Sequence, residues 1–355
     1  MIEFGSDIPL AFDGDFYGSG STYAPTLVAA RGTVRFGRTK LESPDSNDTV
    51  IGESIRQLSA PQHLPEEDGY TLELLEGMPN GADQTNQELF VTTSNGGIHV
   101  NLFEVAVRAA IAAGQGRQLR YFAPQGNSGT HGIGLDEWRA YAQTGSWLRG
   151  SGDTLWPSGF IQAVAKTVGQ PAVLSATGHG GIVTTALAAT LPRGSVKQII
   201  QMDRLGLVPT PLTGQLRDQG QKTEGVSYET NDPRDYASAH SRWLLVENRT
   251  DNFRRLPLPF NSLTAVMANP LATRHAGSTI ERDFRQALVR QPEAAVTFVV
   301  PGADFHPDIS VRLGALSRMT EAAVRAIVLP GESRNSLTHK PLLAMAAMYA
   351  AQSEG

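Results

Sequence analysis

The stretch Gln-Pro-Ala-Val-Leu-Ser-Ala-Thr-Gly-His-Gly-Gly, residues 170–181, carries the strongest structural signal in the chain. Its apolar first half is typical of a buried strand, and the run that follows it has helical periodicity. The small residues Ala176, Gly180 and Gly181 lie where the strand pattern gives way to the helix pattern, and they are typical of a glycine-rich strand-to-helix turn. Gly178 stands among them, and glycine adopts positive φ without steric strain.

A regular alternation of strands and helices surrounds this turn. The short connections between them predict a mostly parallel, doubly wound sheet with helices on both faces, an α/β architecture. The expected strands are 33–36, 70–75, 88–93, 119–123, 172–176, 196–202, 295–300 and 324–329, and the expected helices are 100–113, 160–168, 182–191, 309–318 and 341–351.

Composition along the chain predicts three parts. Residues 1–86 are expected to hold a polar arm, over residues 1–25, and the first strands. The α/β core is expected over residues 87–203 and 291–355. Between these two halves, residues 204–290 are rich in charges and turn formers, which breaks the alternation and predicts an inserted cap.

Overall composition excludes several classes of protein. The chain has 355 residues, 40% hydrophobic and 18% charged, which is ordinary for a globular protein. Its net charge of −5 offers no basic field for nucleic acid or an anionic membrane, and it has no cysteine for disulfides or thiol chemistry. We expect a soluble, cytoplasmic or virion-associated protein without a signal peptide, a membrane span, a cofactor or a metal site.

The spacing small-x-Gly-x-Gly-Gly over residues 176–181 resembles the nucleophile elbow of the α/β-hydrolase fold superfamily. The resemblance extends over about residues 87–352. Residues 93–97 fall where the family carries its oxyanion loop, with Asn95 in place of histidine, and residues 123–129 resemble the loop after the family's fourth strand. The resemblance implies a serine, aspartate or cysteine nucleophile at position 178, where this chain has glycine.

The resemblance also implies an acid and a histidine nearer the C-terminus. Asp304 is the candidate acid, in a Gly-x-Asp setting one residue shorter than the family's. Arg334 stands at the offset expected for the histidine, and His339 follows it shortly before the last helix. The triad positions are therefore Gly178, Asp304 and His339. Because a triad acts as a unit, acyl-enzyme chemistry is not expected without the nucleophile.

Backbone amides near this turn are candidates for binding. The amide of His179, together with that of Gly96 or Gly97, resembles an oxyanion pair, since backbone donors survive the loss of a side chain. Such a pair predicts a pocket for a small carbonyl or carboxylate ligand. The alternative is a solvated helix N-terminus with no ligand.

Two functional hypotheses follow from Gly178. The first is a non-catalytic, hydrolase-like protein with a binding or assembly role, whose partner is another protein or a second copy of itself. Accessory tail proteins of bacteriophages infecting actinobacteria resemble hydrolases in this way, so a virion tail protein is one form of it. The second is a serine-type carboxylic-ester hydrolase whose nucleophile has been lost or replaced by glycine. Gly178 as an ordinary turn glycine in another doubly wound fold is the structural alternative.

Overall fold

The computed structural model describes thirteen secondary-structure elements and short segments around them. The statements below concern these residues. They are 22–41, 62–63, 73–77, 83–92, 108, 111–112, 115–122, 162, 164–166, 168–177, 180–202, 284–302, 308–330, 332 and 341–353.

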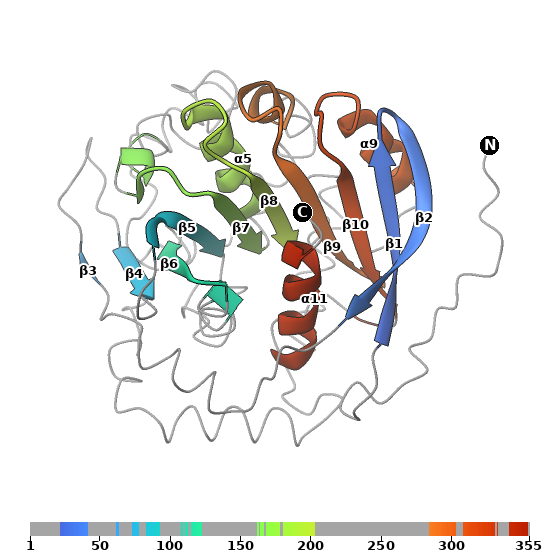
Figure 1. The fold of residues 1–355 in the computed structure, drawn as a ribbon, viewed down its shortest axis with the longest axis horizontal. Helices are drawn as coiled ribbons and strands as arrows, with labels where there is room; N and C mark the ends of the chain where they lie inside the picture. The colour runs from blue at the N-terminus through green and yellow to red at the C-terminus, as the bar shows by residue number, and fades with distance from the viewer. Residues whose placement is uncertain are drawn as a thin grey trace, which may run out of the picture.

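Ten strands form one sheet in the order β2-β1-β10-β9-β8-β7-β5-β6-β4-β3 (Figure 1). The strands are β1 (Thr22–Ala30), β2 (Thr33–Leu41), β3 (Gln62–His63), β4 (Glu73–Gly77), β5 (Asp83–Thr92), β6 (Arg117–Phe122), β7 (Val173–Thr177), β8 (Gln198–Met202), β9 (Ala295–Pro301) and β10 (Val324–Leu329). The six strands from β10 to β6 pair in parallel, and the pairs at both sides of the sheet are antiparallel. The predicted mostly parallel sheet is confirmed.

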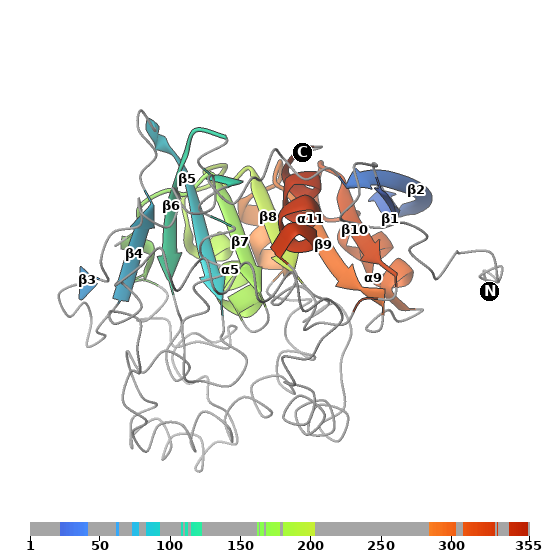
Figure 2. The ribbon, with the colours of Figure 1, turned by 90° about the horizontal axis from the view of Figure 1, so that it is seen from below.

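Helices cover both faces of the sheet. Helices α5 (Gly180–Thr190) and α9 (Asp308–Leu316) lie on one face, here called the α5 face, and α11 (Pro341–Ser353) lies on the opposite, α11 face (Figure 2). Helix α11 begins with proline, whose fixed φ and missing N–H suit the first turn. Where the structure describes them, the predicted strands and helices overlap elements of the same type, but β2 extends to Leu41 and β5 begins at Asp83, well beyond the predicted ends. Of the described helices, none is long and apolar enough to cross a membrane.

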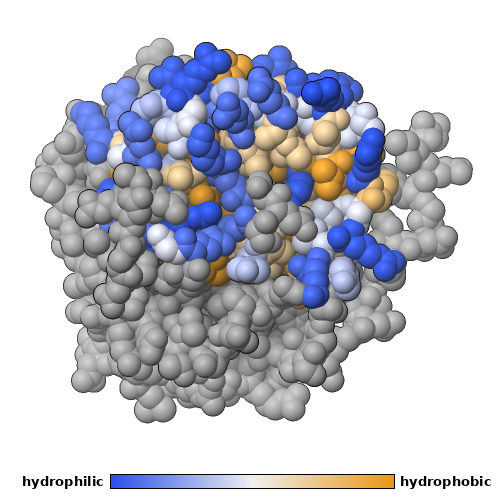
Figure 3. Space-filling model, in the orientation of Figure 1, coloured by the Kyte–Doolittle hydropathy of each residue, from blue (hydrophilic) through white to orange (hydrophobic). Residues whose placement is uncertain are grey.

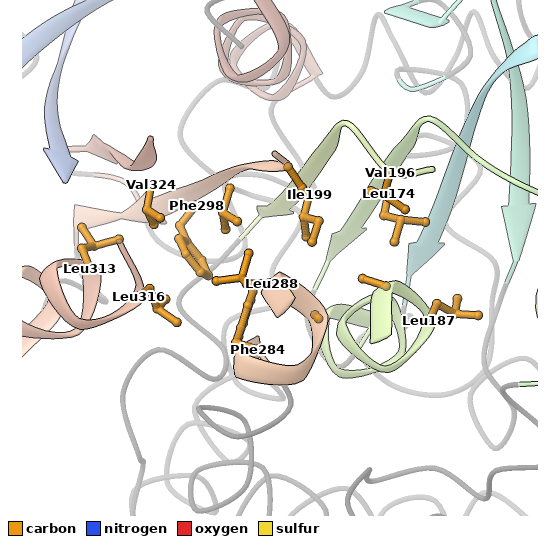
Figure 4. Packing of buried hydrophobic residues seen from close by; sticks show 14 of the residues in the cluster. Leu174, Leu187, Val196, Ile199, Phe284, Leu288, Phe298, Leu313, Leu316 and Val324 are labelled. Carbon is orange, nitrogen blue, oxygen red and sulfur yellow. The ribbon is translucent and has the colours of Figure 1, made fainter. Parts of the chain in front are cut away.

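The α5 face carries the larger apolar core. Leu174, Ile199 and Phe298 of the sheet belong to this core together with Phe284, Leu288 and Leu187, and Leu174 lies near Leu187 while Phe298 lies near Phe284 and Leu288 (Figure 4). The rings of Phe284 and Phe298 have centroids 5.7 Å apart and planes tilted by 54°, a favourable arrangement for an aromatic pair.

One predicted boundary needs correction at this core. Residues 284–290 were expected to belong to the cap, but they are helical, and Phe284, Ala287 and Leu288 are buried in the core of the sheet. Their spacing puts the three apolar side chains on one side of a helix, while Arg285 and other polar neighbours are exposed. The charged residues of this segment hid that pattern. The remainder of the predicted cap, residues 204–283, lies outside the described residues.

The second correction concerns the N-terminal hairpin. Residues 22–25 were assigned to the arm, yet they open β1, which pairs with both β2 and β10. Pro25 obscured the strand pattern. It is tolerated because the pairing between β1 and β10 begins only at Thr26, so no bond of that ladder requires its missing N–H. Arg31 and Gly32 join the two strands with φ of 49° and 84°, as a two-residue hairpin turn requires.

Candidate functional site

The order of the strands reverses between β5 and β7. From β5 the chain passes to β6 on one side, returns to β7 on the other side of β5, and continues outward through β8, β9 and β10. In open α/β sheets, ligands bind outside the carboxyl ends of the strands at such a switch point. This argument places the candidate site at the carboxyl edge of the sheet, beside β5 and β7.

The ends of the parallel strands are aligned at this edge. Thr92, the last residue of β5, pairs with Thr177 at the end of β7, which in turn pairs with Met202 at the end of β8. Pro301 and Leu329 end β9 and β10 and are also partners. Neighbouring strands lie about 4.8 Å apart, so these strand ends form one continuous edge of the sheet.

The segments that follow these strands carry every residue that the sequence predicts for the site. Gly178 directly follows β7, and the predicted oxyanion loop, acid and histidine follow β5, β9 and β10. The structure therefore brings together the points from which these segments start. The residues themselves lie outside the described part of the chain: Gly96, Gly97, Gly178, His179, Asp304 and His339, together with Asn95 and Arg334.

The turn after β7 has the context that a nucleophile elbow requires. Strand β7 ends at Thr177 and α5 begins at Gly180, so only Gly178 and His179 connect them. A strand, a two-residue turn and a helix in the centre of a parallel sheet are the arrangement in which this motif places its nucleophile. Position 178 is therefore the first residue beyond the central strand at the switch point.

The first turn of α5 is held by β8. The carbonyl oxygen of Gly181 accepts hydrogen bonds from Thr184 Oγ1 at 3.0 Å, Thr185 Oγ1 at 2.7 Å and Gln201 Nε2 at 3.0 Å. A Cβ atom added to Gly181 would lie 3.1 Å from the side chain of Gln201. Glycine at this position therefore makes room for a buried glutamine that ties the helix to the neighbouring strand.

A buried carboxylate lies on the α11 face, away from the predicted site. Glu88 in β5 is fully buried and accepts hydrogen bonds from Ser175 Oγ at 2.6 Å and Gln352 Nε2 at 3.1 Å. Arg108 Nη1 lies 3.9 Å from the same carboxylate, and its guanidinium lies 4.2 Å from the centre of the Phe90 ring. A charge this deeply buried requires such partners.

We infer a structural role for this cluster from its position in the sheet. The parallel pairing of β5 with β7 starts at Glu88, whereas the candidate site is at the opposite, carboxyl ends of these strands. Sequence reasoning did not single out Glu88 or Ser175. The signal that was available is a polar residue inside each of two otherwise apolar, buried strands, which predicts a partner in the core.

The last turn of α11 is fixed by the same polar region. Gln198 Nε2 and Arg325 Nη2 donate hydrogen bonds of 2.5 Å and 2.9 Å to the carbonyl oxygen of Ala351. Arg325 also donates to Thr297 Oγ1 at 3.2 Å. A cation at the end of a helix satisfies carbonyl groups that have no partner within the helix.

Strand order, strand direction and the turn after β7 together define the class of the protein. The order β3-β4-β6-β5-β7-β8-β9-β10, with β3 and β4 antiparallel to their neighbours and the others parallel, is that of the α/β-hydrolase fold, to which β1 and β2 add a hairpin. The predicted fold class is confirmed. Fold alone does not determine function, because sites of many kinds are built on one fold.

Solved structures of this fold are similar to the chain over most of its length. A proline iminopeptidase from Mycobacterium smegmatis is 16% identical, covering 82% of this chain and 98% of its own, with a TM-score of 0.45. An esterase from Pyrobaculum calidifontis is 11% identical, covering 86% of this chain and 87% of its own, with a TM-score of 0.46. A carboxyl esterase from Bacillus coagulans is 12% identical, with coverages of 82% and 96% and a TM-score of 0.44. No protein-family model and no curated protein matches the sequence.

Proposed function

We propose that this chain is a non-catalytic protein of the α/β-hydrolase fold with a binding or assembly role. The observation that carries the proposal is the glycine at position 178, directly after β7 at the switch point of the sheet. A side-chain nucleophile must supply an oxygen, sulfur or nitrogen atom to form a covalent intermediate, and glycine has no side chain. The partner is another protein or a second copy of the chain.

Contacts of the surrounding scaffold support this reading. The first turn of α5 is held through the carbonyl of Gly181 and the side chain of Gln201, neither of which is a reacting group. The start of α5 is thus held by hydrogen bonds that do not depend on a nucleophile. An accessory role in a bacteriophage tail is one form of assembly that the sequence resemblance suggests. A small carbonyl or carboxylate ligand at the backbone amides of His179 and Gly96 or Gly97 is also compatible with it.

An activity assay on three forms of the full chain tests the proposal. The unmodified protein, Gly178→Ser and the matched control Gly178→Ala are incubated with a fluorophosphonate probe and with p-nitrophenyl esters. We expect no labelling and no turnover above background for the unmodified chain and the alanine control. Labelling of the unmodified chain would show that it is a hydrolase with another nucleophile.

The serine variant separates the two functional hypotheses. A folded Gly178→Ser without turnover supports a protein whose remaining site is also lost. Turnover by Gly178→Ser alone would show that the acid, the base and the oxyanion donors are in place, and would favour an ester hydrolase that lacks only its nucleophile. Thermal melting followed by circular dichroism establishes that each variant is folded.

A further inference from the structure

The connections that precede the parallel strands form a surface at the amino edge of the sheet, opposite the candidate site. We call this surface the amino edge and define it as residues 30–33, 190–197, 290–295 and 317–323. The turn between β1 and β2 belongs to it, because Ala29 pairs with Val324 at the start of β10. In Figure 1 the amino edge is the upper side of the molecule. A partner bound here would therefore lie away from the candidate site.

Hydrogen bonds tie the connections of the amino edge to one another. The carbonyl oxygen of Pro292 accepts a bond of 3.0 Å from the N–H of Glu321. Gln291 is fully buried, donates to the carbonyl oxygen of Pro192 at 2.9 Å and accepts the N–H of Val196 at 3.2 Å. The connections before β8, β9 and β10 are thus held as one preorganised surface, which reduces the entropy lost when a partner binds.

The hairpin turn is attached to the same surface. The N–H of Gly32 donates a hydrogen bond of 2.9 Å to Ser317 Oγ. A Cβ atom on Gly32 would lie 2.5 Å from Arg318 Nε, and the φ of 84° at this residue also favours glycine. The side chain of Arg318 therefore lies against the turn that carries Arg31.

The amino edge is basic in a chain that is acidic overall. It carries five exposed cations and two exposed carboxylates, although the whole chain has a net charge of −5. One of the carboxylates, Glu293, lies 3.8 Å from Lys197. Figure 3 shows hydrophilic residues gathered along this side of the molecule. The cations are Arg31, Arg193, Lys197, Arg290 and Arg318, and the carboxylates are Glu293 and Glu321.

This pattern of charges decides between possible occupants. Contact between the amino edges of two copies would bring cations against cations, and like charges across an interface are unfavourable. A DNA duplex carries one negative charge per about 1.7 Å, so it would meet Glu293 and Glu321 as well as the net negative charge of the chain. An acidic polypeptide has fewer charges and can place other residues opposite the two carboxylates. Arginine, the commonest cation of this edge, suits a carboxylate partner because its fork of N–H groups binds both oxygens.

The width of the amino edge suits a short extended segment. The strand order β2-β1-β10-β9-β8 includes four spacings between neighbouring strands, which at about 4.8 Å each give about 19 Å. Extended chain rises by about 3.3 Å per residue, so about six residues cover this distance.

We propose that the amino edge binds an extended, carboxylate-rich segment of a partner protein. The carboxylates of the segment would lie beside the arginines at the hairpin turn and before β8, β9 and β10. The inference deepens the proposed binding role by naming the chemistry of the partner, and it rests on that role only for the existence of a partner. Its test uses no ester substrate, so the two proposals can fail separately.

Binding of an acidic peptide to the full chain tests the proposal. The probe is a dye-labelled peptide of about six glutamates, which matches the width of the edge. Fluorescence anisotropy follows binding in low salt and in about 1 M salt, where charges are screened beyond roughly 3 Å. We expect saturable binding in low salt that is lost in high salt. No binding in low salt overturns the proposal.

Charge reversal on the amino edge locates the binding surface. Arg193→Glu/Arg318→Glu is expected to weaken binding by on the order of tenfold or more, because the peptide then meets like charges. Arg31→Glu/Arg193→Glu, which leaves Arg318 in place on the hairpin turn, is expected to give a similar loss. Binding that both folded variants leave unchanged overturns the proposal. Circular dichroism establishes that each variant is folded.

A matched control separates the amino edge from the charge of the whole chain. Arg35→Glu/Arg38→Glu makes the same change of net charge at two exposed cations of β2 outside the amino edge, and it is expected to leave the affinity nearly unchanged. An equal loss in the control overturns the proposal. So does tighter binding of a DNA duplex or of phosphatidylserine vesicles than of the peptide. Self-association of the chain that Arg193→Glu/Arg318→Glu abolishes, measured by light scattering, would assign the surface to a second copy and likewise overturn the proposal.

Discussion

The two faces of the sheet are held to their helices by different interactions. On the α5 face the inward-pointing side chains are almost entirely apolar along the strands, as Leu174, Phe298 and Val324 illustrate. On the α11 face several strands become apolar toward their carboxyl ends, where Ile200 and Val299 belong to the same core as residues of α11. Toward their other ends, the same strands carry polar side chains: Glu88, Gln198, Thr297 and Arg325.

The two faces therefore contribute differently to the stability of the fold and to the orientation of the helices on the sheet. Burial of apolar surface is strong but non-directional, so it holds α5 and α9 against the sheet without fixing an angle. Hydrogen bonds to the carbonyl of Ala351 and to Gln352 are directional, and they determine where the last turn of α11 ends. We infer that the α5 face supplies most of the stability and the α11 face most of the specificity.

The largest effect is expected on the α5 face. Phe298→Ala removes a fully buried ring that packs on Phe284, and we expect the free energy of unfolding to fall by about 4 kcal/mol, because the cavity cannot collapse between the sheet and a helix. Urea denaturation measures the change. Val311→Ala is the matched control, since Val311 is 70% exposed and its truncation should change stability by less than about 0.5 kcal/mol. A loss below about 1 kcal/mol for Phe298→Ala would contradict the assignment of this face as the main core.

A smaller loss of stability is expected on the α11 face, and a second substitution is expected to reverse part of it. Glu88→Met leaves the guanidinium of Arg108 buried without that carboxylate, and we expect a loss of about 3 kcal/mol. The double variant Glu88→Met/Arg108→Met is expected to be more stable than the single variant, because it also removes the buried guanidinium that has lost this carboxylate. Denaturation in urea compares the two.

The control for this pair is an ion pair of the same type at the surface. Lys197 and Glu293 are 63% and 69% exposed and lie 3.8 Å apart, so Glu293→Gln should cost less than about 1 kcal/mol. If the double variant were no more stable than Glu88→Met, the polar cluster would contribute through packing alone, and its role in orientation would lose its support.

Sequence patterns predicted the centre of the sheet better than its sides. Strands such as Val324–Leu329 and the helix from Pro341 have uniform local signals, so their type follows from neighbouring residues. The first strand was missed because Pro25 interrupts its alternation, and Arg31-Gly32 is a weaker turn signal than Asn-Gly. The local sequence pattern was therefore sufficient to predict the type of those elements that are buried on both sides.

The sequence predicted the strands after which the candidate site residues follow, but it did not predict the buried polar cluster beneath them. The turn at Gly178 has a local signature, and the strand ends place that position at the switch point. The cluster of Glu88, Ser175 and Gln352 joins residues from distant parts of the sequence, and only the strand order brings them together. Contacts between residues so far apart in the sequence produce no local periodicity from which they can be predicted.

The smallest effect tests the hydrogen bonds that Gln201 of β8 makes to α5. Gly181→Ala would place a Cβ atom 3.1 Å from Gln201, whose amide is held by Gly181 and Thr185, so the glutamine must shift and weaken about one hydrogen bond. We expect a loss of about 1 kcal/mol in the unmodified chain and almost none in a Gln201→Ala background. A double-mutant cycle measured by urea denaturation should give a coupling of about that size.

The control glycine in this cycle is Gly194, which has φ of 72° and no atom near the position of an added Cβ. Gly194→Ala is expected to destabilise through backbone strain alone and to show no coupling to Gln201. Additive effects of Gly181→Ala and Gln201→Ala would mean that the glycine is not required by the glutamine. A measured coupling would show that Gly181 is required by the side chain of Gln201 and not by a reacting group. Glycine at position 181 would then be explained in a protein that has glycine in place of a nucleophile at position 178.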